Sequence, residues 1–157
     1  MKKTGAENGF SLVEITLALG VAAFALTAIV GLLSLTLKNS KSAMDDTLVA
    51  EMTGDLVNTL RKQDFTNISK ATNVFFDISG KRLNALDSAG LIQGMAVSSA
   101  VSQGAVYECV PVIAADTNTL SPDGSANLWQ VTLNFRWPAG ANSTVNQKTI
   151  HANIARY

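Results

Sequence analysis

A run of uncharged residues near the start of the chain limits its possible folds more than any other feature. From Ile15 to Leu37 the sequence has 23 residues without a charge or a proline. As an α-helix this run would be about 35 Å long at ~1.5 Å per residue, which exceeds the roughly 30 Å hydrocarbon core of a bilayer. The run therefore predicts a helix that can span a membrane with some tilt.

The run has two simpler interpretations. A secretory signal peptide would have an apolar region of only about 7 to 15 residues, followed by a small-residue cleavage site. The run is longer than that, and Lys38-Asn39-Ser40-Lys41 directly after it offers no such site. A plain N-terminal membrane anchor, by contrast, agrees with the hydropathy of the run.

An acidic residue directly before the run indicates a function beyond membrane anchoring. A carboxylate in a spanning helix costs about 2.5 to 3.5 kcal/mol at the bilayer centre and less toward the interface, so Glu14 predicts a partner of opposite charge. Cleavage between Gly9 and Phe10 would supply that partner. It would create an amino terminus about 6 Å along the helix axis from Glu14, on this chain or on a neighbouring copy. Residues 1–9 would then be a short leader on the cytoplasmic side.

These residues resemble a known family. Gly9 followed by Phe10-Ser11-Leu12-Val13-Glu14 is similar to the prepilin-type cleavage and methylation signal of type IV pilins and type II secretion pseudopilins. The resemblance implies that a prepilin peptidase cuts after Gly9 and N-methylates Phe10. It also implies that Glu14 pairs with the amino terminus of the preceding subunit during assembly. Where many major pilins have a helix-breaking proline, this chain has Gly31.

The resemblance is strong over residues 1–40 and extends to the rest only as general architecture. It implies a structural subunit that assembles with other pilin or pseudopilin subunits on an inner-membrane platform. The head of the subunit would lie in the periplasm, and the assembled subunits would form an envelope-spanning filament. A short head without a disulfide loop resembles a minor pseudopilin of a type II secretion system more than an adhesive major pilin, and a minor type IV pilin is the alternative. The chain is also similar to the pseudopilin-like cassette proteins of Verrucomicrobia.

Charge and cysteine content narrow the function of the remaining residues. Beyond Leu37 the chain carries ten basic and ten acidic residues, and such a neutral exterior gives no electrostatic reason to expect nucleic acid as a ligand. Cys109 is the only cysteine, so no disulfide can form within the chain. We expect it to be a small buried residue of a strand.

A second helical pattern follows the membrane segment. From about Ser42, apolar residues recur at spacings of three and four with polar residues between them: Val49, Met52, Leu56 and Leu60. Because no proline lies between Phe10 and Arg61, we predict one continuous helix of roughly 75 Å. The expected organisation is a leader at 1–9, a membrane and assembly helix at 10–37, an amphipathic helix at 38–62 and a β-rich head at 63–157.

The head shows strand patterns of different strength. The clearest runs from Leu128 to Trp137, where apolar and polar residues alternate, and we expect its apolar face to cover the amphipathic helix. Weaker patterns predict four further strands. Thr144–Ile154 pairs antiparallel with the first, Asn73–Ile78 forms a hairpin with Lys81–Leu83, and Tyr107–Ile113 is an edge strand because of Pro111. The segment Leu86–Ala96 is ambiguous between loop and short strand. The predicted fold is α+β and pilin-like, with one long helix packed under an antiparallel sheet of four or five strands.

No catalytic motif is present, so we expect no enzyme activity and no cofactor. His151 is expected on a solvent-facing strand position. Asp116, Asn118 and Asp123 could supply oxygen ligands for calcium, but their spacing favours a polar surface loop without a metal. Two alternatives to a filament subunit are a membrane-tethered periplasmic binding module, for which Glu14 would be incidental, and an anchored enzyme.

Overall fold

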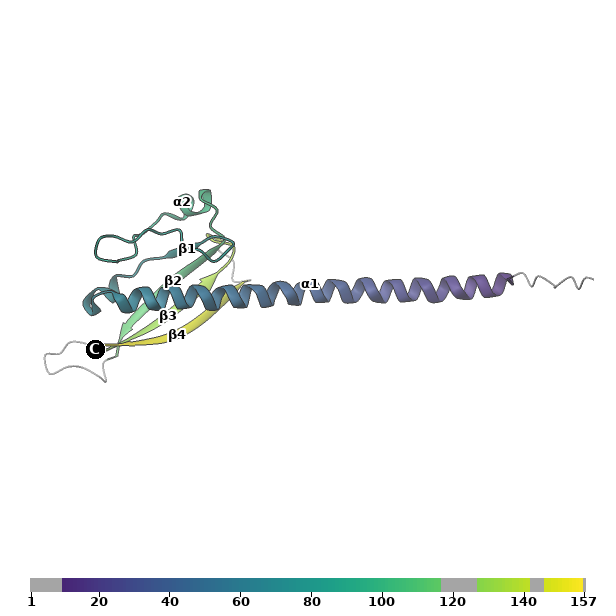
Figure 1. Cartoon of the computed structure of the whole chain (residues 1–157), viewed down its shortest axis with the longest axis horizontal. Helices are drawn as coiled ribbons and strands as arrows, with labels where there is room; N and C mark the ends of the chain where they lie inside the picture. Colours follow the sequence, from purple (N-terminus) through teal and green to yellow (C-terminus); the bar gives the residue numbers. More distant parts are fainter. Residues whose placement is uncertain (1–9, 117–126, 142–145, 157) are drawn as a thin grey trace, which may run out of the picture. The chain divides into compact units, whose positions relative to one another are not determined.

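The computed structural model describes residues 10–116, 127–141 and 146–156, and it has an α+β architecture (Figure 1). The chain divides into two compact units, residues 1–44 and 45–157. Helix α1 (Leu12–Lys62) contributes to both units, which confirms the prediction of a single long helix. Most of the polar loop expected between Asp116 and Asn127 lies outside the described residues.

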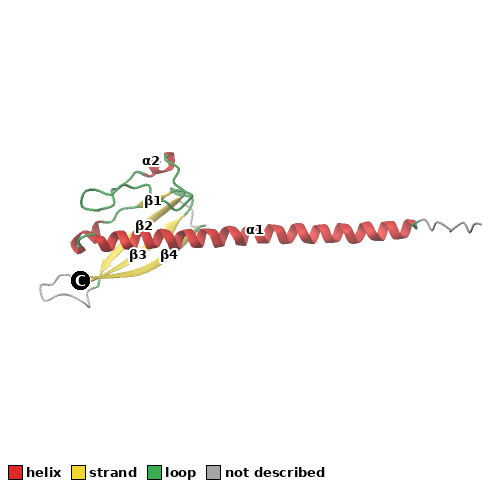
Figure 2. Cartoon of the chain, viewed as in Figure 1, coloured by secondary structure: helices red, strands yellow, loops and turns green. Residues whose placement is uncertain are grey.

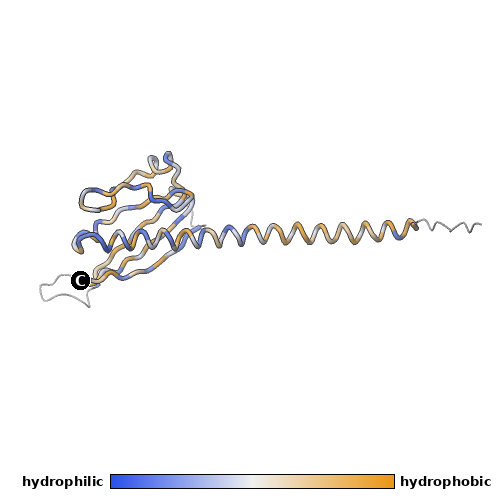
Figure 3. Tube along the Cα trace, in the orientation of Figure 1, coloured by the Kyte–Doolittle hydropathy of each residue, from blue (hydrophilic) through white to orange (hydrophobic). Residues whose placement is uncertain are grey.

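The N-terminal unit consists of the apolar part of α1. Its large apolar side chains are all exposed, from 47% at Ile15 to 81% at Leu12, and Figure 3 shows this part of the helix as mostly hydrophobic. The hydroxyls of Thr16, Thr27 and Thr36 each donate to a carbonyl of the preceding turn, at 2.9 Å. Hydroxyl groups satisfied inside the helix suit a surface that faces an apolar environment.

The head is a four-stranded antiparallel sheet on one side of the remaining part of α1 (Figure 2). Its strands are β1 (Val74–Phe76), β2 (Tyr107–Ala115), β3 (Leu128–Arg136) and β4 (Gln147–Ala155), and they lie in the order β1-β2-β3-β4. The predicted hairpin of β3 with β4 is confirmed, with Leu133 opposite Ile150 and Trp129 opposite Ile154. Two short helices, η1 (Phe65–Lys70) and α2 (Val97–Ser102), were not predicted.

The core of the head forms between α1 and the inner face of the sheet. The predicted apolar stripe of the helix is buried there together with the apolar face of β3: Val49, Met52, Leu56 and Leu60 from α1, and Val131, Leu133 and Phe135 from β3. Two adjacent carboxylates of α1 attach the helix to different strands. Tyr107 donates its hydroxyl hydrogen to Asp45 at 2.7 Å, and Lys148 pairs with Asp46 at 2.7 Å.

The prediction that Pro111 places its strand at a sheet edge is wrong. Strand β2 lies between β1 and β3, and Pro111 pairs with Leu133 of β3. The proline is tolerated because β1 is only three residues long and pairs with residues 107–109 alone. At Pro111 that side of β2 has no strand partner among the described residues, so the missing N–H breaks no ladder there.

The segment between β1 and β2 contains two turns of the same design. In the first, Asp77 Oδ1 accepts the N–H groups of Ser79 and Lys81, and Gly80 has φ +80°. In the second, Asp87 Oδ1 accepts the N–H groups of residues 89 and 91, and Gly90 has φ +75°. The first turn forms the predicted return of the chain, although only the bridge of Phe76 with Arg82 follows it. The second turn settles the ambiguous segment, which has the bridge of Leu86 with Ile92.

Candidate functional site

The residues singled out by the sequence lie at the start of α1. Phe10 and Ser11 precede the helix, and the side chain of Phe10 is 80% exposed. The carbonyl of Ser11 accepts the N–H groups of Glu14 at 3.0 Å and of Ile15 at 3.2 Å. Gly9, the residue before the expected cut, lies outside the described residues. The structure thus gives the geometry of the residues after the expected cut and none for the cut itself.

Ser11 has a local role that was not predicted from the sequence. Its Oγ lies 3.4 Å from the N–H of Glu14 and accepts a hydrogen bond from it, so Ser11 caps the helix. Glu14 occupies the third helical position, which makes Ser11-Leu12-Val13-Glu14 a capping-box sequence. A carboxylate there also interacts favourably with the positive end of the helix. The S-x-x-E spacing was the available signal for this cap.

The carboxylate of Glu14 is exposed and has no hydrogen bond or ion pair with the described part of the chain. It is the single charge on the helix surface between Leu12 and Leu37. An apolar surface of this extent is typical of a membrane-inserted segment or a protein interface. By length and composition the helix could cross a membrane.

The other residues considered from the sequence fall into three groups. His151 is exposed on β4, as predicted, with Nδ1 3.0 Å from the hydroxyl of Thr132. Cys109 is fully buried in β2, also as predicted, and burial raises the pKa of its thiol. Of the calcium candidates, Asn118 and Asp123 lie outside the described residues. Within the described ranges no three acidic, histidine or cysteine side chains gather as metal ligands.

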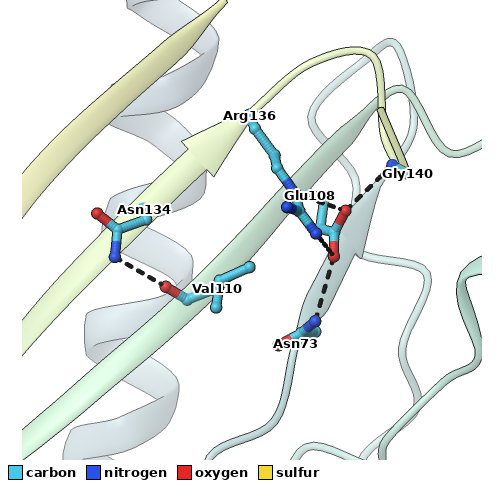
Figure 4. Close-up of polar contacts among 6 residues, drawn as sticks. All are labelled: Asn73, Glu108, Val110, Asn134, Arg136 and Gly140. Atoms are coloured by element: carbon cyan, nitrogen blue, oxygen red, sulfur yellow. Dashed lines mark hydrogen bonds and ion pairs between the residues drawn. The ribbon is translucent and has the colours of Figure 1, made fainter. Parts of the chain in front are cut away.

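The most elaborate polar cluster of the head was not predicted. The side chain of Glu108 is fully buried on the face of β2 opposite the core and accepts hydrogen bonds from three neighbours (Figure 4). Arg136 donates twice, at 2.7 and 2.9 Å, while Asn73 Nδ2 and the Gly140 N–H each lie at 3.1 Å. Burial alone would raise the pKa of Glu108, but these hydrogen bonds outweigh it and lower the pKa below its usual value.

The Glu108 cluster joins four separate segments: the chain before β1, strands β2 and β3, and the turn after β3. Glu108 lies directly opposite Arg136 in the β2–β3 ladder, so opposite charges on neighbouring strands were the available signal. That signal needed the register of the two strands, which the sequence does not contain. Because both carboxylate oxygens of Glu108 accept hydrogen bonds from the chain's own groups, the cluster holds these four segments together and stabilises the head.

Comparisons with protein-family models, with curated proteins and with solved structures find no match to this chain. The arrangement of the helices and strands nevertheless resembles a known fold. The fold resembles that of a pilin. Its elements are a long N-terminal apolar helix followed by a four-stranded antiparallel sheet, with the second part of the helix packed against the sheet.

Proposed function

We propose that this protein is a minor pseudopilin-like structural subunit that polymerises through its N-terminal helix into a type II secretion pseudopilus or a related pilus-like filament. One observation carries the proposal: a single helix exposes an apolar surface with one carboxylate at its start, and continues as the buried spine of a β-rich head. A simple anchor requires the apolar surface but gives Glu14 no partner.

The proposed roles follow the sequence order. A prepilin peptidase removes residues 1–9 by cutting between Gly9 and Phe10, and Phe10 is N-methylated. Residues 10–37 hold the subunit in the inner membrane and later form the filament core, residues 38–62 continue into the head, and residues 63–157 face the periplasm. Glu14 pairs with the terminal amine of another subunit, which neutralises both charges in an apolar setting.

The first test is the N-terminal mass spectrum of the protein extracted from membranes of its native host. A chain that begins at methylated Phe10 is the expected result. A Gly9→Val variant should stay uncut, since a branched side chain replaces the hydrogen of glycine next to the scissile bond. A wild-type chain that still begins at Met1 would contradict the proposed processing.

The capping geometry favours one alternative function, a membrane-tethered periplasmic binding module that does not polymerise. If Glu14 serves only as the third residue of a capping box, a glutamine would serve equally well. Glu14→Gln keeps that acceptor and removes the charge. On our proposal this variant is inserted in the membrane but is absent from sheared filaments, whereas Glu14→Asp keeps part of the incorporation. Normal incorporation of Glu14→Gln would support the module instead.

A further inference from the structure

A short cationic strip of α1 follows directly after its apolar part. The uncharged run that ends at Leu37 is followed by Lys38-Asn39-Ser40-Lys41-Ser42, and all five of these side chains are exposed. The two lysines of this strip are the only charged residues between Ile15 and Met44. The strip, residues 38–42, therefore carries two positive charges and no acidic side chain.

Neither lysine of the cationic strip has a counter-ion within the part of the chain that the structure describes. No ion pair or hydrogen bond of either side chain occurs there. The next acidic residues along α1 already have partners in the head. Asp45 accepts the hydroxyl hydrogen of Tyr107 at 2.7 Å, and Asp46 pairs with Lys148 at 2.7 Å. The two ammonium groups of the strip are three residues apart, which places them next to each other on the helix surface.

The length of the apolar run determines where the strip would lie in a bilayer. Glu14 and Lys38 are 24 residues apart, which is about 36 Å along a helix. The hydrocarbon core is roughly 30 Å thick, and the headgroups add about 5 to 8 Å on each side. With Lys38 at one boundary of the core, Lys41 lies about 4.5 Å farther out, inside the headgroup layer, and Glu14 lies beyond the opposite boundary. Asp45 lies about 10 Å farther out than Lys38 and so outside this layer.

We propose that Lys38 and Lys41 bind the phosphate groups of anionic phospholipids in the leaflet at this end of the span. The inference rests on the membrane insertion that the proposed function requires. Lysine binds phosphate as a point charge, and its flexible stem lets the ammonium group reach the headgroups while the methylene groups stay in apolar surroundings. An acidic protein surface would have the same charge. The lipid is favoured because the span length itself brings both lysines to the level of the phosphates.

The expected preference for anionic lipid follows from the two charges. Each lysine near an anionic surface should favour binding by about fivefold. The two lysines together should therefore favour an anionic over a zwitterionic lipid by more than tenfold at low salt. Because salt screens such contacts, this preference should fall when the NaCl concentration is raised from about 0.05 M to about 0.5 M.

Fluorescence quenching in vesicles measures the lipid preference at the strip. The full-length chain carries a bimane label at Ser42→Cys, and the native Cys109 is buried and stays unlabelled. The chain is reconstituted in phosphatidylcholine vesicles that contain either nitroxide-labelled phosphatidylglycerol or nitroxide-labelled phosphatidylcholine. The ratio of the two quenching efficiencies gives the relative affinity of the two lipids beside the strip. Quenching requires close approach, so basic residues at the other end of the span do not contribute.

Neutral and charge-conserving variants separate lipid binding from a change in insertion. Lys38→Gln with Lys41→Gln should bring the quenching ratio close to one, and each single change should lower it by about fivefold. Lys38→Arg with Lys41→Arg keeps both charges and should keep the preference. Lys62→Gln, at the far end of the same helix, is the matched control and should behave like the wild-type chain.

Two results would overturn the lipid contact. One is equal quenching by the two lipids in the wild-type chain, and the other is a preference that persists after Lys38→Gln with Lys41→Gln. Both would leave the filament proposal standing if the chain from the native host begins at methylated Phe10. A wild-type chain that does not insert into the vesicles would overturn both proposals, because each needs a membrane-spanning helix.

Discussion

The two parts of helix α1 have opposite relations to their apolar residues. Between Leu12 and Leu37 the large apolar side chains occur all round the helix and are exposed. From residue 45 onward they occur on one stripe, and Val49, Met52 and Leu56 are at most 2% exposed. A helix that is apolar all round needs an apolar environment from outside the chain, whereas an amphipathic helix finds it in its own domain. The first part is therefore built for a bilayer or a neighbouring copy, and the second for the head.

Truncating one leucine in each part of α1 tests this difference most directly. Leu56→Ala leaves a cavity in the core and should lower the free energy of unfolding of the head by about 2–5 kcal/mol. Leu26→Ala, at a side chain that is 63% exposed, should leave it unchanged. Urea unfolding of the detergent-solubilised chain, followed by the fluorescence of Trp129 and Trp137, measures both. An equal effect of the two changes would contradict the division.

The second prediction concerns the buried carboxylate of the head, which differs from the exposed carboxylate of Glu14. Arg136→Ala removes the partner of Glu108 and leaves a buried charge with fewer hydrogen bonds, so the head should lose about 3 kcal/mol of stability. Glu14→Ala, the matched change in the apolar part, should leave head unfolding as it is. If Arg136→Ala leaves the free energy of unfolding of the head unchanged, the Glu108 cluster does not stabilise the head.

Acid should affect the head through the same group. The pKa of Glu108 is lower in the folded than in the unfolded chain, where a glutamate titrates near ~4.3. Its stabilising contribution is therefore complete above that unfolded value and is lost as the pH falls through the folded pKa. Asp77, whose pKa is lowered by its hydrogen bonds with Ser79, adds in the same direction. Between pH 5 and pH 2, Glu108→Gln should reduce the loss in urea midpoint, and an unchanged slope would contradict this assignment.

The smallest expected change in the stability of the head comes from replacing a glycine of α1 by alanine. Gly54 lies in the helix interior of the head part, and a Cβ there would meet nothing within 4 Å. Gly54→Ala should therefore stabilise the head by about 0.5–1 kcal/mol. Gly31→Ala has the same open space in the apolar part and should leave head stability unaltered. Gly80→Ala is the opposing control, because its φ of +80° and the nearby Leu48 make alanine unfavourable. Differential scanning calorimetry distinguishes the three.

Much of the fold could be predicted from local patterns. The alternation from Leu128 to Trp137 indicated which face of β3 is buried, since side chains of a strand point to opposite sides in turn. The stripe of Val49, Met52 and Leu56 indicated the inner side of α1 for the analogous reason, a period of about 3.6 residues. The length of the uncharged run that ends at Leu37 was enough to predict a helix that can span a membrane. These features are encoded within a few neighbouring residues, and the sequence alone determined them.

The tertiary structure decided features that depend on partners far apart in the chain. Pro111 could lie inside the sheet because β1 is too short to pair beside it, and no local pattern records the length of a neighbouring strand. Glu108 became a buried, ionised group because folding brought Arg136, Asn73 and the Gly140 N–H around it. A carboxylate cannot be buried without such donors, and they come together only when the strands adopt their register.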